Sequence, residues 1–268
     1  MTRSSVKLGV ARKFAPDLVE YITFLGRAGV DALEIGFAFG IPPKLDNEAI
    51  AAAKKCEVAL SCHLPFWINL GNDNTQKNIE YLTAGLRVAN QLGSIAVFHL
   101  GFYGGKSFDR LLPSIVSTLR EVVDRMGPGI GRLGIETTGK QKALGTVEEI
   151  AAIVTNLDGE RFIPVVDWAH IYARTDGECP TSVRDVDTIL DRCNEVCTGI
   201  SYFHGGGIEY KNGNEIRHVS VISGSPSVEM IIATLLERCP DGLTYIVESP
   251  DSIEDVKWLR MRLGLQSQ

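Results

Sequence analysis

Short apolar segments alternate with longer segments of helical periodicity along the whole chain, and this alternation restricts the possible folds more than any other feature. Several of the short segments, such as residues 95–98 and 162–166, are apolar on both faces, which is typical of strands in a buried parallel sheet. We predict strands at residues 6–10, 31–36, 58–63, 95–99, 133–136, 162–167, 200–204 and 243–248. We predict helices at residues 16–28, 47–55, 75–92, 108–126, 147–156, 183–196, 228–238 and 253–263.

Eight strand-helix units in series, with no second block of different composition, predict a single (β/α)8 TIM barrel spanning residues 1–268. A Rossmann sheet is the alternative, but no GxGxxG motif follows the first predicted strand. Three glycines do follow the seventh strand, at residues 205–207, yet we interpret residues 208–213 as a turn rather than as the start of a helix. The barrel is therefore the predicted fold.

Composition excludes several classes of protein. A hydrophobic fraction of 44% is too high for a disordered chain, and no apolar stretch approaches the roughly 18 residues of a membrane span. The first residues lack the apolar segment of a secretory signal, so we expect a soluble, cytoplasmic protein with no membrane partner. The six cysteines contain no CxxC pair and are expected to be free thiols.

The net charge of -6 argues against a protein whose whole surface binds nucleic acid. It does not exclude binding at one place, because bound metal cations can reverse the sign of a carboxylate-rich cleft. Whether the protein binds nucleic acid therefore depends more on where the acidic residues lie than on how many there are.

Six consecutive predicted strands, from the third to the eighth, end on a histidine or a carboxylate. These residues are His63, His99, Glu136, Asp167, His204 and Glu248, with His170 just after the sixth strand and His218 in the loop after the seventh. Any one of them could be a packing residue or a helix cap. As a set they lie at the end of the barrel where this fold builds its active sites, and the carboxylates would repel one another without cations.

The mixture of imidazole and carboxylate groups favours Zn, Mn, Fe or Co over Ca or Mg. The set is larger than one ion requires, so at least two ions are expected. Two ions about 3.5–4 Å apart would supply a hydroxide and stabilise both the attacking and the leaving oxygen of a phosphodiester.

The strand ends lie in segments that form a recognisable series. The segments are His63-Leu-Pro-Phe-Trp-Ile-Asn-Leu, Phe98-His99-Leu-Gly, Ile135-Glu136-Thr-Thr-Gly, Val166-Asp167-Trp-Ala-His170, Phe203-His204, Arg217-His218 and Ile246-Val-Glu248-Ser-Pro. In this order they resemble the metal motifs of endonuclease IV, or AP endonuclease family 2, of the xylose isomerase-like TIM barrel superfamily. The loop Gly-Ile-Glu-Tyr at residues 207–210 is similar to that of the shorter archaeal-type branch.

The resemblance implies two or three divalent ions, with Zn favoured and Mn, Fe or Co as alternatives. His63 and His99 would hold one ion, Glu136 would bridge it to a second held by Asp167, His204 and Glu248, and His170 and His218 would hold a third. The implied activity is cleavage of damaged double-stranded DNA on the 5′ side of abasic sites by a monomer, through a metal-bridging hydroxide. Glu136 and Glu248 would then be the catalytic residues.

Two positions depart from the family pattern. Ile216 stands where bacterial members have an Asp ligand of the third ion, so that Glu209 or Glu215 would substitute or the third site would be weak or empty. Residues 36–43 lack the Arg that such enzymes insert into the duplex. Phe66 and Trp67 match the other wedge residues and could stack on bases, or simply cover the barrel mouth.

Basic residues near the mouth are candidate phosphate contacts or ordinary solvated charges. They are Arg217, which we include among the substrate-binding residues, and Lys140, Lys142, Arg174 and Lys211.

Two other functions remain open. A sugar isomerase or epimerase of the same superfamily would hold one ion on Glu136, Asp167, His204 and Glu248 and would move a proton next to a carbonyl. Such an enzyme does not need His63 and His99 as ligands, which favours the phosphodiesterase. A non-catalytic metal-binding barrel is less well supported, because the ligands crowd the functional face.

Overall fold

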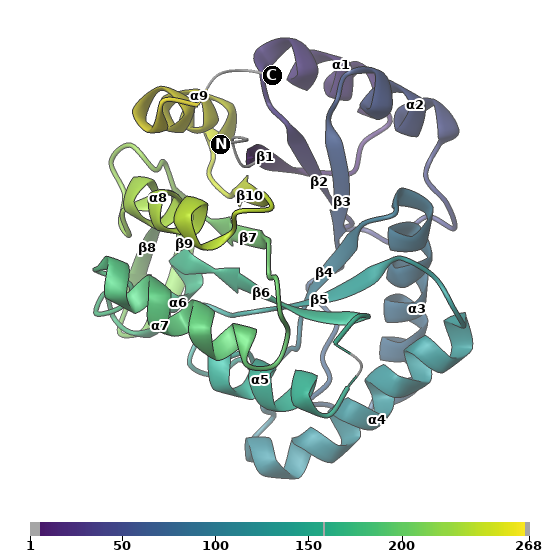
Figure 1. Ribbon diagram of the computed structural model, residues 1–268. Helices are drawn as coiled ribbons and strands as arrows, with labels where there is room; N and C mark the ends of the chain where they lie inside the picture. The colour runs from purple at the N-terminus through teal and green to yellow at the C-terminus, as the bar shows by residue number, and fades with distance from the viewer. Residues whose placement is uncertain (1–5, 158, 266–268) are drawn as a thin grey trace.

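Eight parallel strands close into a barrel in the computed structural model, which describes residues 6–157 and 159–265 (Figure 1). Around the barrel the strands follow the order β1-β10-β7-β6-β5-β4-β3-β2. Their bounds are β1 Val6–Lys13, β2 Ala32–Gly36, β3 Ala59–His63, β4 Ile95–His99, β5 Arg132–Glu136, β6 Phe162–Asp167, β7 Tyr202–Gly205 and β10 Leu243–Val247. The predicted TIM barrel is therefore confirmed.

Helices follow the strands and form the outer layer of the molecule (Figure 1). They are α1 Leu18–Ala28, α2 Asn47–Lys55, α3 Thr75–Leu92, α4 Phe108–Met126, α5 Val147–Thr155, α6 Trp168–Arg174, α7 Val183–Asn194, α8 Val228–Arg238 and α9 Ser252–Leu263. Helix α1 illustrates why helical periodicity predicted these helices, because it buries Leu18, Ile22 and Leu25 on one face. It is capped at its C-terminus by Gly29, which has a φ of 73°.

The register of the strands gathers the polar strand ends on one level. Gly36 lies opposite His63, His99 opposite Glu136, and Asp167 opposite His204. Residues that are partners in adjacent parallel strands point to the same side of the sheet. The side chains of His63, His99, Glu136, Asp167 and His204 therefore meet at the carboxyl end of the barrel, above an interior filled by buried apolar side chains.

Three elements were not predicted, namely helix α6 and the two strands of a hairpin. Helix α6 begins directly after β6, because the Asp167 side chain accepts a hydrogen bond from the backbone N–H of His170 at 2.8 Å and so caps the new helix. The predicted turn at residues 208–213 is wrong in extent. It is the central part of a β-hairpin, β8 Gly207–Lys211 and β9 Asn214–Val219, with positive φ at both Asn212 and Gly213.

Gly205, the last residue of β7, and Gly206 directly after it allow this hairpin to fold back over the barrel. A Cβ on Gly205 would lie 2.2 Å from the hydroxyl of Tyr245, and one on Gly206 would lie 2.3 Å from the carbonyl oxygen of Glu248. A larger residue at either position would clash with the last strand. The hairpin thus brings β9, and His218 with it, to the mouth of the barrel.

Two further expectations bear on the described residues. None of their helices is long and apolar enough to cross a membrane. All six cysteines are free, and four of them are buried. Burial raises the pKa of Cys62, which makes its thiol unreactive.

Candidate metal centre at the mouth of the barrel

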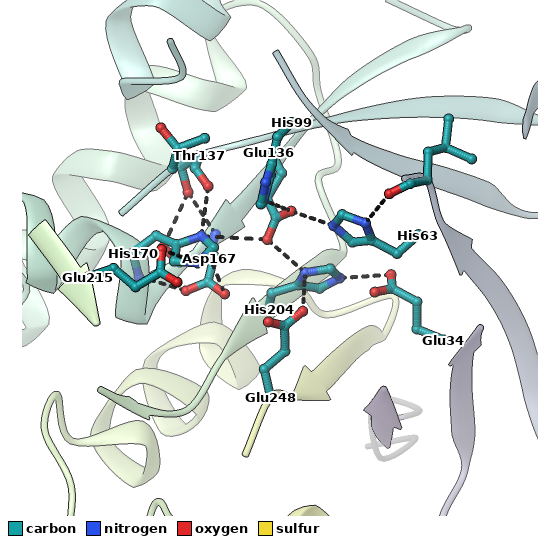
Figure 2. A network of polar contacts seen from close by, with 12 residues as sticks. Glu34, His63, His99, Glu136, Thr137, Asp167, His170, His204, Glu215 and Glu248 are labelled. Atoms are coloured by element: carbon teal, nitrogen blue, oxygen red, sulfur yellow. Dashed lines mark hydrogen bonds and ion pairs between the residues drawn. The ribbon is translucent and has the colours of Figure 1, made fainter. Parts of the chain in front are cut away.

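All eight predicted metal ligands lie in one polar network at the carboxyl end of the barrel, most of which Figure 2 shows. Their donor atoms form three adjoining groups, and Asp167 belongs to the third group as well as to the second. The groups are His63, His99 and Glu136; Glu136, Asp167, His204 and Glu248; and Asp167, His170 and His218, with the donor atoms of each group within 4.8 Å of one another.

Glu136 is at the centre and is fully buried. Its Oε2 lies 2.8 Å from His63 Nε2 and 2.6 Å from His99 Nε2, while its Oε1 lies 2.9 Å from His204 Nδ1. Burial opposes ionisation, yet the charges of His99 and His204 and hydrogen bonds from His204 and His63 hold the pKa of Glu136 well below its usual range. Each oxygen thus faces a different group, as a bridging carboxylate requires.

The second group closes around His204. His204 Nδ1 lies 3.2 Å from Glu248 Oε1, and both ring nitrogens are fully enclosed. Burial works against the charge on Glu248, but the hydrogen bond and charge of His204 hold the pKa of Glu248 below its usual range. Asp167 is different, because burial raises its pKa despite the nearby His170 and His218.

The third group is held by backbone contacts as well as by side chains. His170 Nδ1 donates to the carbonyl of Thr137 at 2.9 Å, so that Nε2 is the nitrogen directed to the cavity. His63 is held in the same way by the carbonyl of Leu64, also at 2.9 Å. Such contacts fix the tautomer of a metal-binding histidine.

A β-bulge at Ile216 decides which of the two nearby glutamates faces the centre. Arg217 pairs with Glu209 and Glu215 pairs with Tyr210, which leaves Ile216 without a partner. Because the bulge shifts the alternation of side chains, Glu215 faces the centre and its Oε2 lies 3.5 Å from His170 Nε2. Glu209 instead forms an ion pair with Arg217 at 2.6 Å. Of the two candidate substitutes for the missing carboxylate, Glu215 is the one at the site.

Several buried donor atoms fit bound cations. Asp167 Oδ2 and His218 Nδ1 have no hydrogen-bond partner among the described residues, and His99 Nε2 approaches Glu136 without hydrogen-bond geometry. Buried polar atoms without partners are costly in a folded protein. Nitrogen and carboxylate oxygen donors suit Zn, Mn, Fe and Co. The residues present therefore fit a centre for more than one such ion.

A cavity of about 410 Å³ opens above this centre. The imidazoles of His63, His99, His170 and His218 contribute to its lining. The aromatic residue Phe66 lies at its edge with 73% of its surface exposed, and its ring packs edge-to-face on Trp67 with centroids 5.2 Å apart. The cavity is thus open at the mouth of the barrel, with an exposed aromatic ring at its edge.

The predicted basic contacts differ in their surroundings. Lys140, Lys142 and Lys211 are exposed, and Arg217 is exposed but paired with Glu209. Arg174 donates to the carbonyl oxygens of Lys140 and Ala143, at 2.5 and 2.9 Å, and so braces the loop after β5. The guanidinium of Arg174 is engaged in these hydrogen bonds within the protein. Arg174 is therefore a structural residue, and its interpretation as a substrate contact is corrected.

Two cavity residues escaped the sequence reasoning. Glu34 is a buried carboxylate inside the apolar strand β2, and an ionisable residue in such a strand was the available signal. Lys13 lines the cavity because β1 continues beyond its predicted end at residue 10. By register it is the partner of Gly36, on the side that faces the barrel interior.

Comparison with known proteins gives both sequence and structural likenesses. The family model described as a xylose isomerase-like TIM barrel, AP endonuclease family 2, matches residues 22–262. An uncharacterized protein of Methanocaldococcus jannaschii is 26% identical over 248 residues, which cover 88% of each chain.

Two solved structures share the fold. A D-tagatose 3-epimerase-like protein superposes with a TM-score of 0.73 and 21% identity, covering 97% of this chain and 98% of that one. Endonuclease IV from Thermus thermophilus superposes with a TM-score of 0.71 and 18% identity, covering 96% of this chain and 97% of that one.

Proposed function

This chain belongs to the xylose isomerase-like TIM barrel family, whose members are enzymes, and we propose that it is a metal-dependent phosphodiesterase that cleaves damaged DNA on the 5′ side of abasic sites. The observation that carries the proposal is the convergence of His63 and His99 on Glu136 Oε2, at 2.8 and 2.6 Å. This forms a ligand group beside the one that a single-ion isomerase needs. The likeness to endonuclease IV, at 18% identity, agrees with it.

Each group of donors would hold one ion. His63 and His99 would share an ion with Glu136, and Asp167, His204 and Glu248 would share another with it. His170 and His218, with Asp167 and the nearby Glu215, would hold a third. When bound, these ions, with Zn favoured, supply an activated water and stabilise negative charge on the phosphoryl oxygens.

The two catalytic carboxylates have distinct tasks. Glu136 is fully buried and keeps the two groups of donors at a fixed separation. Glu248 lines the cavity, where its side chain is 20% exposed and lies between His204 and His218. Since the pKa of Glu248 lies below its usual range, its carboxylate is ionised and would accept a hydrogen bond that orients the attacking water.

The rim of the cavity would bind the DNA. Phe66 and Trp67 offer exposed ring faces on which unpaired bases stack. Lys13 supplies positive charge within the cavity, and Arg217 lies farther out on the hairpin with its charge shared with Glu209. Local cations of this kind allow an acidic protein to hold the phosphate backbone.

Sugar isomerisation or epimerisation is the second candidate. It is favoured by the complete group Glu136, Asp167, His204 and Glu248, which by itself forms a single-ion site, and by the fold shared with a D-tagatose 3-epimerase-like protein. In that case Glu136 and Glu248 would exchange a proton with the carbon next to a carbonyl. His63 and His99 would then have no place in the chemistry.

Metal content and one variant test the proposal. Purified protein loaded with Zn or Mn should contain two or three ions per chain and cleave a duplex that carries a tetrahydrofuran abasic analogue. Glu136→Gln should lose cleavage and keep its fold by circular dichroism, because the amide cannot serve as a bridging anion. One ion per chain, with ketose epimerisation and an uncut duplex, would establish the second candidate instead.

A further inference from the structure

We propose that Glu34 is a positioning residue that orients His204 for the metal centre, an assignment that rests on the proposed metal-dependent function. Glu34 lies on β2, across the barrel from β7, and is 1% exposed. Its role would be to bind one nitrogen of the His204 ring so that the other nitrogen faces Glu136 and Glu248.

The His204 ring lies between carboxylates on opposite sides (Figure 2). Its Nε2 lies 2.9 Å from Glu34 Oε2, and its Nδ1 lies 2.9 Å from Glu136 Oε1 and 3.2 Å from Glu248 Oε1. His204 is fully buried, so water does not compete for either nitrogen. The ring can therefore take only the orientation that these neighbours define.

An ionised carboxylate only accepts hydrogen bonds, and a neutral imidazole carries one N–H. Without metal, both nitrogens of His204 donate, Nε2 to Glu34 and Nδ1 to Glu136. When a metal is bound, Glu34 would keep the remaining proton on Nε2, and the lone pair of Nδ1 would be directed to the centre. A histidine that binds a metal commonly donates its other N–H to a carboxylate, and loss of such a partner lowers metal affinity about 10–100-fold. Glu34 is the carboxylate that would accept this second N–H from His204.

Glu34 is itself held in place by Tyr202 of β7, which in turn contacts Ser61 of β3. Tyr202 donates its hydroxyl hydrogen to Glu34 Oε2 at 2.8 Å, since a carboxylate cannot donate in return. The Tyr202 oxygen then accepts from Ser61 Oγ at 2.6 Å. Ser61, Tyr202 and Glu34 form a directed chain of hydrogen bonds that ends on His204. A carboxylate fixed in this way defines the tilt of the imidazole.

The competing interpretation is that Glu34 is a ligand, because its carboxylate and nitrogens of His63 and His204 lie within 4.8 Å of one another. The contacts favour the positioning role. Glu34 Oε2 already accepts from both Tyr202 and His204, and His63 Nε2 is directed to Glu136 at 2.8 Å. An ion bound by Glu34 would use Oε1, which has no hydrogen-bond partner among the described residues, and it would still displace His63 or His204 from its present contact.

Zn titration of the metal-free protein, in competition with a chromogenic chelator, separates these interpretations. Glu34→Ala should keep the number of ions and weaken one site about 10–100-fold. Glu34→Gln should restore most of the affinity, because its amide oxygen still accepts from Nε2–H, and Tyr202→Phe should cause a smaller loss. Glu149→Gln is the matched control, since Glu149 is also buried but bonds Tyr103 and the start of α5.

Nitrogen NMR of the Zn-loaded protein gives a readout that a general loss of stability would not produce. His204 should carry its proton on Nε2 in the wild type, and this preference should weaken in Glu34→Ala alone. Loss of one whole ion in both Glu34 variants would overturn the assignment by making Glu34 a ligand, and unchanged affinity and tautomer would overturn it as well. A wild type that binds no divalent metal would overturn the proposed function together with it.

Discussion

Glu215 Oε2 lies 3.5 Å from His170 Nε2, although Glu215 is one residue away from the position at which a carboxylate was expected. The bulge at Ile216 turns the side chain of Glu215 toward the centre. A chain can thus lose a ligand at one position and regain the same chemistry from the adjacent residue. The consequence is that the third group of donors need not be empty.

Removing Glu215 should therefore weaken the third ion specifically. Glu215→Ala is expected to lower the affinity of one of the three sites by at least about 10-fold, because a carboxylate close to His170 is lost. Glu209→Ala, on the other strand of the hairpin and paired with Arg217, is the control and should leave all sites unchanged. Equal metal affinities in both variants and the wild type would show that Glu215 holds no ion.

His99 distinguishes the two candidate functions. His99→Ala should lose one ion per chain and slow cleavage of the abasic duplex by about 100-fold or more, the effect of several kcal/mol on the transition state. A single-ion isomerase would keep its ion on Glu136, Asp167, His204 and Glu248 and would lose little activity. Metal analysis of the purified variant, beside its rate on both substrates, provides the check.

Metal binding should depend on pH because protons compete for the histidines. Burial lowers the pKa of His63, but its hydrogen bond to Glu136 and the surrounding carboxylates raise the pKa to about 9. Burial acts in the same direction on His170, where the charges of Asp167 and Glu136 raise the pKa to about 9. Both rings are therefore protonated at neutral pH without metal and must release protons when they bind it.

Calorimetry in two buffers of different ionisation enthalpy would measure this proton release. Affinity should increase with pH and level off above about pH 9. The stability of the metal-free protein should instead decrease as the pH rises. Both pKa values are raised above 6.5, so their contribution to stability is complete below that pH and is lost as the pH rises through 9. Affinity that does not change between pH 6 and 8 would contradict this account.

The exposed ring of Phe66 should contribute to DNA binding rather than to stability. Phe66→Ala is expected to raise KM for the abasic duplex by about 5–150-fold, the effect of about 1–3 kcal/mol of base stacking, with little change in Tm. Phe24→Ala is the matched control, because Phe24 is 50% exposed but lies on α1 outside the cavity lining. Similar KM values for the two variants would remove Phe66 from the binding surface.

The barrel could be predicted from the sequence because each unit carries its own local signal. A strand such as β4 is apolar on both faces, and a helix such as α1 has apolar residues at helical spacing. Seven of the eight metal-type residues end barrel strands or follow them closely, and parallel strands bring their ends together. His218 instead reaches the centre on the hairpin strand β9.

The remaining features depend on contacts between distant segments. Glu34 lies in mid-strand, and its role follows only from its register beside β1 and β3 and its contact with His204 across the barrel. Glu215 reaches the centre through a bulge that no local pattern announces. Arg174 looked like a surface cation, but the loop that it braces is distant in sequence from α6.

The central claim is that a centre for two or more ions cleaves phosphodiesters at abasic sites. Its most direct test is a single end-labelled duplex with one tetrahydrofuran residue, incubated with the Zn-loaded or Mn-loaded protein and resolved on a denaturing gel. The account predicts one cut immediately 5′ of the tetrahydrofuran, with no cut in a matched undamaged duplex. An intact damaged duplex, with fully metal-loaded protein that epimerises ketoses, would contradict it.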